Sequence, residues 1–133
     1  MSEKDLELGS AELDVLKALW DLGPATVRQV MARLHDRGRR VAYTTVLTFL
    51  TRLEQKGHVR SDKSGLAYVY RAKLSRQRVS RSRLRSLIQQ LYDGAAGPLV
   101  MQLVQDERLT PEEIDALQRL IERLDAQNSG PGT

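Results

Sequence analysis

Residues 41–57 read VAYTTVLTFLTRLEQKG, and this stretch decides the fold of the chain. At about 100° per residue on a helical wheel, its side chains separate into two arcs. The apolar arc consists of Val46, Leu47, Phe49, Leu50 and Leu53, and the polar arc consists of Thr44, Thr45, Thr48, Thr51, Arg52 and Gln55. The stretch therefore predicts an amphipathic helix with one side against the core, ended by Gly57.

The polar arc of this helix contains no carboxylate, because Glu54 lies at the edge of the apolar arc. A solvated helix face usually mixes both signs of charge, whereas hydroxyls, an amide and a guanidinium suit phosphate oxygens and base edges. A plain core helix with a polar back fits the periodicity of this stretch equally well. The residues that we expect in the major groove are Tyr43, Thr44, Thr45, Thr48 and Arg52.

Two further helices are predicted upstream of this stretch. Apolar residues recur at spacings of three and four over residues 11–22 and again over residues 27–37. Ser10 is the predicted N-cap of the first helix and Thr26 that of the second, since a hydroxyl accepts from free backbone N–H groups there.

A short basic turn joins the second helix to the stretch at residues 41–57. Two helices linked in this way are typical of a helix-turn-helix. Arg39 and Arg40 lie in the turn. Arginines in a loop are more often solvated. These two lie beside the helix predicted at residues 41–57, which we call the recognition helix, and this position favours contacts to phosphates.

The periodicity changes from helical to alternating after Gly57. Residues 58–63 and 66–71 alternate around Ser64-Gly65, which predicts a β-hairpin with a two-residue turn. A hairpin directly after the recognition helix is the wing of a winged helix-turn-helix domain. Lys63 at its tip and Arg71 on its second strand are predicted to approach DNA. Tyr68 and Tyr70 are predicted to pack the wing on the helices rather than to stack on bases.

Three helices are predicted in the C-terminal part of the chain. They cover residues 75–93, residues 99–105 and a last helix opened by Thr110 as N-cap and Pro111. Their apolar stripes hold more surface than a small appendage can hide, so we expect burial against a second copy. The predicted dimerisation residues are Leu87, Leu91, Leu99, Leu103, Ile114, Leu117, Leu120, Ile121 and Leu124.

The net charge of +4 is distributed unevenly along the chain. Residues 1–57 carry a net +1, residues 58–90 carry +8 with Asp62 as the single acid, and residues 91–133 carry −5. We expect the middle segment to attract a polyanion and the C-terminal segment to repel it.

The composition also excludes several classes of protein. The absence of cysteine excludes disulfides, thiol nucleophiles and thiolate metal sites, and the isolated His35 and His58 make no metal cluster. No nucleophile with a base and no phosphate loop is present, so the sequence predicts neither an enzyme nor a cofactor. No apolar run is long enough to span a bilayer and no signal peptide is recognisable, which predicts a soluble, cytoplasmic protein without membrane insertion.

These residues together resemble the penicillinase-repressor group of bacterial regulators, the BlaI, MecI and CopY relatives. The resemblance runs from Gly9 to about Asp125 and rests on SAELDVLKALW, TVRQV, AYTTVLTFLTRLEQKG, GLAYVYRA and GPLVMQLVQDERLTPEEIDALQRLIE. It implies an N-terminal winged-helix domain, a helical dimerisation domain and repression through an inverted-repeat operator. In antibiotic-responsive members it further implies inactivation by a membrane sensor protease.

Three departures from the family pattern limit this resemblance. The copper-responsive branch binds metal through a C-terminal cysteine motif, which this chain lacks. Thr44 and Leu47 stand where the staphylococcal type of recognition helix carries basic side chains, so its operator sequence should not be transferred. The Asn-Phe bond that the sensor protease cuts corresponds here to Gln102-Leu103. We expect Leu99, Val100, Leu103 and Val104 to be residues of the dimer core, and this bond not to be a substrate of the same protease specificity.

The sequence thus predicts a mainly α fold with a small β-hairpin wing. We expect a winged helix-turn-helix domain at residues 1–73, a dimerisation domain of three helices at residues 74–127 and a disordered tail at residues 128–133. The predicted function is a sequence-specific, dimeric repressor whose partner is a double-stranded DNA operator. The alternative is a winged-helix module that binds a protein.

Overall fold

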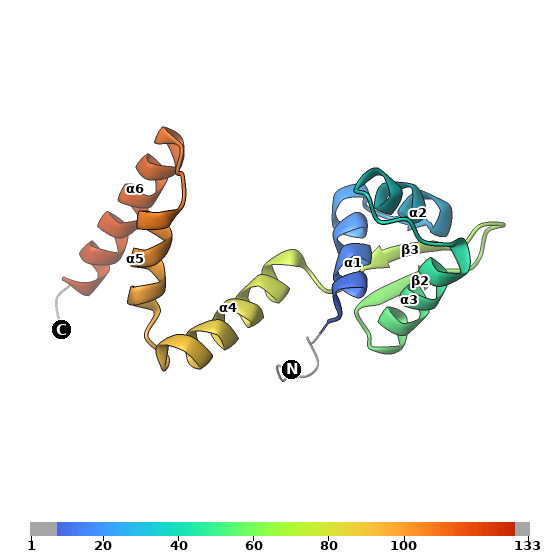
Figure 1. Cartoon of the computed structure of the whole chain (residues 1–133), viewed down its shortest axis with the longest axis horizontal. Coiled ribbons are helices and arrows are strands. Elements are labelled where there is room, and N and C mark those ends of the chain that lie inside the picture. Colours follow the sequence, from blue (N-terminus) through green and yellow to red (C-terminus); the bar gives the residue numbers. More distant parts are fainter. Residues whose placement is uncertain (1–7, 130–133) are drawn as a thin grey trace. The chain divides into compact units, whose positions relative to one another are not determined.

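The computed structural model describes residues 8–129. The N-terminal unit contains three helices and a three-stranded antiparallel sheet with the strand order β1-β3-β2 (Figure 1). Its elements are α1 (Ser10–Leu22), β1 (Ala25–Thr26), α2 (Val27–Asp36), α3 (Tyr43–Gln55), β2 (Val59–Asp62) and β3 (Val69–Ala72). This is the predicted winged helix-turn-helix arrangement, in which the β2–β3 hairpin is the wing.

The core of this unit is built from the apolar stripes of its three helices. The fully buried side chains include Leu16, Leu19, Leu34, Leu50 and Tyr70. Burial of a leucine-sized side chain contributes roughly 1.5–3 kcal/mol, so these stripes supply most of the driving force that brings the helices together. The 3.6-residue periodicity therefore predicted the buried sides of these helices correctly.

The helix caps of this unit agree only in part with the prediction. Thr26 forms a complete capping box, because its Oγ1 accepts from Gln29 N at 3.3 Å and Gln29 Oε1 accepts from Thr26 N at 2.8 Å. Ser10 was predicted as the N-cap of α1, which is wrong. It is the first residue of the helix, and the cap is Gly9 without a side-chain hydrogen bond.

The hairpin departs from the predicted register. Asp62 pairs with Val69, so residues 63–68 form the connecting loop and the expected two-residue turn at Ser64-Gly65 is wrong. The Asp62 carboxylate accepts from Ser64 N at 2.9 Å and from Ser64 Oγ at 2.6 Å, which turns the chain early. Strand β1 also pairs with β3, and this two-residue strand is too short to show a period.

The C-terminal part consists of α4 (Arg76–Tyr92), α5 (Ala96–Asp106) and α6 (Pro111–Asn128). Helix α6 begins as predicted, with a capping box between Thr110 and Glu113 and with Pro111 in its first turn. Helix α5 begins at Ala96, earlier than predicted, because Pro98 is tolerated in a first helical turn. The chain is broken instead at Asp93 and Gly94, both at positive φ.

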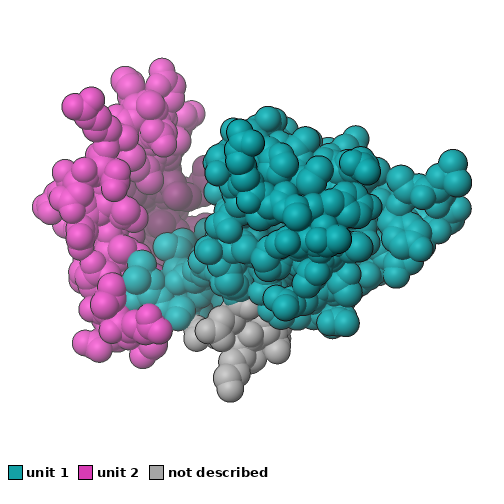
Figure 2. Space-filling model, turned by 45° about the vertical axis from the view of Figure 1, so that its right-hand side comes forward, with its two compact units in different colours: residues 1–87 teal, residues 88–133 magenta. Residues whose placement is uncertain are grey.

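The chain divides into two compact units, residues 1–87 and residues 88–133 (Figure 2). Residues 76–87 of α4 belong to the N-terminal unit, and Val79 is buried in its core. A functional boundary at residues 73–74 stays a prediction. A disordered tail was predicted from Asn128, which is wrong for Asn128 and Ser129, the last residue and the C-cap of α6. Residues 130–133, like residues 1–7, lie outside the described residues.

Candidate nucleic-acid interface

Helix α3 has one side in the core and one side in solvent. Val46, Leu50 and Leu53 are fully buried and hold the helix against α1, α2 and the sheet. The five residues predicted for the major groove are all exposed: Tyr43, Thr44, Thr45, Thr48 and Arg52. The structure therefore places the predicted contact residues together on the free surface of a rigidly seated helix.

Hydrogen bonding within α3 leaves most of this surface free. Thr48 Oγ1 donates to the Thr44 carbonyl oxygen at 2.9 Å, so this hydroxyl retains its oxygen as an acceptor only. Arg52 has no ion pair within residues 8–129. Glu54 is turned toward the wing, where its Oε2 accepts from Ser61 N at 3.2 Å and from the Ser61 hydroxyl. The exposed face thus stays free of carboxylates, as predicted.

The arginines of the turn between α2 and α3 differ in their partners. Arg39 Nε donates to Asp14 Oδ2 at 2.7 Å, which fixes the turn to α1. Arg40 is exposed and has no ion pair in the described part of the chain. A phosphate would compete with Asp14 for Arg39, whereas Arg40 is available without such a cost.

Asp21 joins three arginines of the N-terminal unit. It pairs with Arg37, with Arg76 at 3.1 Å and with Arg33 at 3.8 Å. The hydrogen bond from Arg37 is the main cause that lowers the pKa of the Asp21 carboxyl, and Arg76 adds to the effect. One carboxylate among three guanidiniums leaves this region positive and ties α1, α2 and the start of α4 together.

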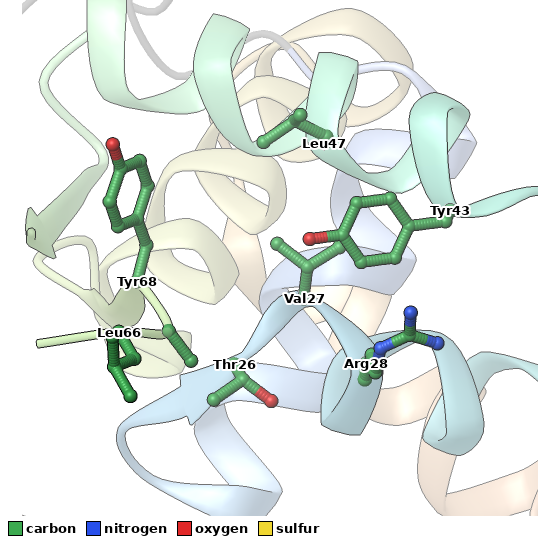
Figure 3. Close-up of a pocket in the computed structure, with 8 residues that line it drawn as sticks. Thr26, Val27, Arg28, Tyr43, Leu47, Leu66 and Tyr68 are labelled. Carbon is green, nitrogen blue, oxygen red and sulfur yellow. The ribbon is translucent and has the colours of Figure 1, made fainter.

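A groove of about 390 Å³ lies beside α3, between the start of α2 and the wing loop (Figure 3). Arg28 stands over the Tyr43 ring, 5.2 Å from its centroid, and Lys63 stands over the Tyr68 ring at 5.6 Å. The groove is lined by Thr26, Val27, Arg28, Tyr43, Leu47, Leu66, Ala67 and Tyr68. Arg28 is thereby held next to the first turn of α3, and Lys63 is held on the wing loop.

The two wing tyrosines have different environments. Tyr70 is buried between β1 and β2, as predicted, and this burial is the main cause that raises the pKa of its phenol. Tyr68 was also predicted to pack the wing on the helices, which is wrong. It belongs to the loop before β3 and is about half exposed at the groove, because the shifted register leaves it outside the ladder.

The register of the β2–β3 ladder also determines which charged residues of the wing lie opposite each other. Arg60 lies directly opposite Arg71 in the β2–β3 ladder, and both side chains are exposed. The hydrogen bonds from Ser64 are the main cause that lowers the pKa of Asp62, and Arg71 contributes. Lys63 follows at the start of the loop, so the exposed side of the wing is mainly positive.

Two basic residues of this surface, Arg28 and Arg60, were not predicted from the sequence. Arg28 was not singled out, because its stacking on Tyr43 joins residues that are distant in sequence. Arg60 was placed opposite Val69 by the predicted turn, instead of opposite Arg71. The Asp-x-Ser sequence at residues 62–64, which favours an early turn, is the signal that predicts the observed register.

Comparison with known proteins adds the decisive observation. Residues 8–123 match the family model of the penicillinase repressor. The chain belongs to this family. The penicillinase repressor of Staphylococcus aureus is 24% identical over 121 residues, covering 91% of this chain and 95% of the relative. That of Bacillus licheniformis is 25% identical over 116 residues, covering 87% and 90%.

A regulatory protein with another name and one solved structure are also similar to this chain. The methicillin resistance regulatory protein MecI of Mammaliicoccus sciuri is 24% identical over 123 residues, covering 92% of this chain and 99% of the relative. A solved structure of Bordetella bronchiseptica BpsR shows a TM-score of 0.47 and 18% identity, covering 94% of this chain and 83% of that chain. By the family that it matches, the chain is a transcriptional repressor of the BlaI and MecI type.

The C-terminal helices of this repressor expose long apolar stripes. Helices α5 and α6 contain no buried residue within the chain itself. Seven of the nine residues predicted for dimerisation are exposed, and Leu99 and Leu117 are half-buried; the exposed ones are Leu87, Leu91, Leu103, Ile114, Leu120, Ile121 and Leu124. The opposite side of α6 is charged and carries the Asp115–Arg119 ion pair.

The bond that corresponds to the protease site of the family lies inside α5. Gln102 and Leu103 are both exposed residues of this helix, and the Tyr92 hydroxyl donates to Gln102 Oε1 at 2.6 Å. Both residues are accessible at the surface, but their backbone is helical.

Neither a metal site nor a membrane span was found in the part of the chain that the structure describes. No group of three or more His, Asp or Glu side chains within residues 8–129 is arranged to hold a metal ion. No helix among these residues is long and apolar enough to cross a membrane.

Proposed function

We propose that this repressor binds double-stranded DNA sequence-specifically, as a homodimer on an inverted-repeat operator. The observation that carries the proposal is the exposed, carboxylate-free side of α3 on a helix seated by Val46, Leu50 and Leu53. Hydroxyls and a guanidinium at fixed positions can recognise base edges, because a rigid helix sets their register along the major groove.

The surroundings of α3 support contacts to the DNA backbone. Arg40 precedes the helix, Arg28 stacks at its first turn, and Lys63 and Arg71 lie on the wing. Phosphate contacts of this kind position a protein on the duplex, whereas side chains in the groove discriminate between bases. We therefore assign backbone contacts to these four residues and base contacts to Tyr43, Thr44, Thr45, Thr48 and Arg52.

The exposed stripes of α5 and α6 support a dimer. Large contiguous apolar surfaces are unusual on a monomer and mark sites of association. A two-fold arrangement buries the same stripe on both copies and presents two α3 helices to two half-sites. We therefore assign dimerisation to the helical region and recognition to the winged-helix unit.

In vitro selection of duplex DNA with the full chain tests this function. We expect an inverted repeat to be enriched, and to bind at least roughly a thousandfold more tightly than a scrambled duplex of equal length. Binding should weaken steeply with salt, because displaced counterions are released from the phosphates. Equal affinity for selected and scrambled duplexes would contradict sequence-specific recognition, and no binding to any duplex would favour the protein-binding alternative.

A second proposal concerns cleavage of the repressor by a membrane sensor protease. We infer that this chain is not cut by the family's Asn-Phe specificity, since Gln102-Leu103 differs in length and lacks the aromatic ring. Immunoblots of cells under β-lactam challenge follow the size of the chain directly. An intact chain during derepression supports the inference, whereas a fragment ending at Gln102 contradicts it.

A further inference from the structure

The wing contains an unfavourable pair of like charges. Strands β2 and β3 pair in antiparallel register, so that Arg60 and Arg71 lie directly opposite each other. Val59 and Tyr70 are buried, and the alternation of a strand therefore directs the two arginines to the outer side of the hairpin. Residues in direct opposition bring their side chains within about 5.5 Å at Cβ, where like charges destabilise the sheet.

The described residues provide little compensation for this repulsion. Neither guanidinium has an ion pair within residues 8–129. The nearest acid in the ladder is Asp62, whose carboxylate already accepts two hydrogen bonds from Ser64. The register therefore places two positively charged residues opposite each other, and Arg71 alone is near an acid, since it contributes to the lowered pKa of Asp62.

We propose that Arg60 and Arg71 bind one backbone phosphate of DNA between them. The proposal rests on the proposed function, and it adds to it a residue and a site on the wing. Two planar guanidiniums offer parallel N–H donors that match the oxygens of a phosphate, and its negative charge removes their repulsion. Binding thus turns an unfavourable pair into a favourable cluster of three charges.

The position of the pair in the fold supports DNA as the occupant. Ser61, the neighbour of Arg60, is held by Glu54 of α3 through its backbone N–H at 3.2 Å and through its hydroxyl. The pair is therefore fixed relative to the recognition helix and moves with it. A phosphate contact here sets how the wing and α3 are placed on the same duplex.

The test uses Arg60→Gln in the full chain, because the proposal predicts opposite effects on stability and on binding. Removing one charge relieves the repulsion, and Tm should rise by about 1–4 °C at low salt. Affinity for the selected operator should fall by roughly tenfold per half-site, whereas the slope of log K against log salt should change little, because Arg71 still contacts the same phosphate. Arg60→Lys, which keeps the charge but not the planar fork, should bind with intermediate affinity.

Arg123→Gln is the matched control, since this exposed arginine lies on α6 and has the same charge change. We expect it to change neither Tm nor operator affinity appreciably. A rise in Tm without loss of affinity would overturn the proposal, because the pair would then bind no phosphate. A fall in Tm would also overturn it, because the arginines would then stabilise the wing themselves. Failure of the unaltered chain to bind any duplex would instead contradict the proposed function.

Discussion

Substitution of Ile121 by alanine tests the assignment of the C-terminal stripes to a dimer. Ile121 is 60% exposed within one chain and belongs to the α6 stripe. Shortening it to alanine removes three carbon atoms, worth about 0.8 kcal/mol each when fully buried. If the dimer buries the exposed part, the loss is about 1.4 kcal/mol per copy.

Two-fold symmetry doubles this loss, because each residue of a symmetric interface occurs twice. The dimer should be weakened by about 3 kcal/mol, which raises its dissociation constant roughly hundredfold. Sedimentation equilibrium over a dilution series measures this constant, and circular dichroism verifies that the helices remain folded. Operator affinity should fall in parallel, since two linked winged helices bind with a high effective concentration.

Glu122→Ala is the control on the same helix. Glu122 is exposed, and by the helical period it lies on the charged side rather than in the apolar stripe. It should leave the dissociation constant unchanged. An Ile121→Ala chain that dimerises like the unaltered protein would refute the assignment of this stripe to the interface.

Three further predictions concern the winged-helix unit. Arg52→Ala should weaken operator binding by roughly 1–3 kcal/mol if it contacts a base, and an unchanged titration would remove Arg52 from the interface. Thr26→Ala deletes the hydroxyl of the α2 capping box and should lower the free energy of unfolding by about 1 kcal/mol in denaturant titrations. The pKa of Asp21 is lowered in the folded state, so its stabilising effect is complete above its usual value of 3.8 and is lost as the pH falls through the lowered pKa. Melting curves should therefore show Asp21→Asn to be less stable near neutral pH, with a difference that shrinks on acidification; a constant difference would contradict the role of the Arg37 contact.

The helices could be predicted from the sequence because their information is local. The apolar spacing around Leu16, Leu34 and Leu50 repeats with the helical period, and these side chains are the buried ones. The hydroxyl caps at Thr26 and Thr110 were also recognisable, since a capping box depends on residues three positions apart. Ser10 shows the limit of this reasoning, because a helix can also begin without a side-chain cap.

The wing could be predicted as a hairpin but not in its register. An alternating pattern is compatible with several loop lengths, and a shift of pairing changes every cross-strand neighbour. The pairing of Arg60 with Arg71 therefore had no local signal in the alternation itself. The ion-pair partners of Arg39 and Arg76 could not be predicted from the sequence either, because Asp14 and Asp21 lie on a helix far away in sequence.

The helical structure of α5 and its exposed apolar stripe both affect whether a protease could cut the chain at Gln102-Leu103. Proteases bind their substrates as extended chains, and extended peptides present backbone groups that a helix uses internally. Cutting at Gln102-Leu103 therefore requires local unwinding of α5, including loss of the 2.6 Å hydrogen bond from Tyr92 to Gln102. An α5 packed in a dimer would resist this opening, whereas the exposed stripes of a separated chain have no buried contacts to lose. Weakening of the dimer would thus favour cleavage, and cleavage would in turn separate the recognition helices. If repression depends on the proposed dimer, a signal that loosens the helical region would release it even without a protease.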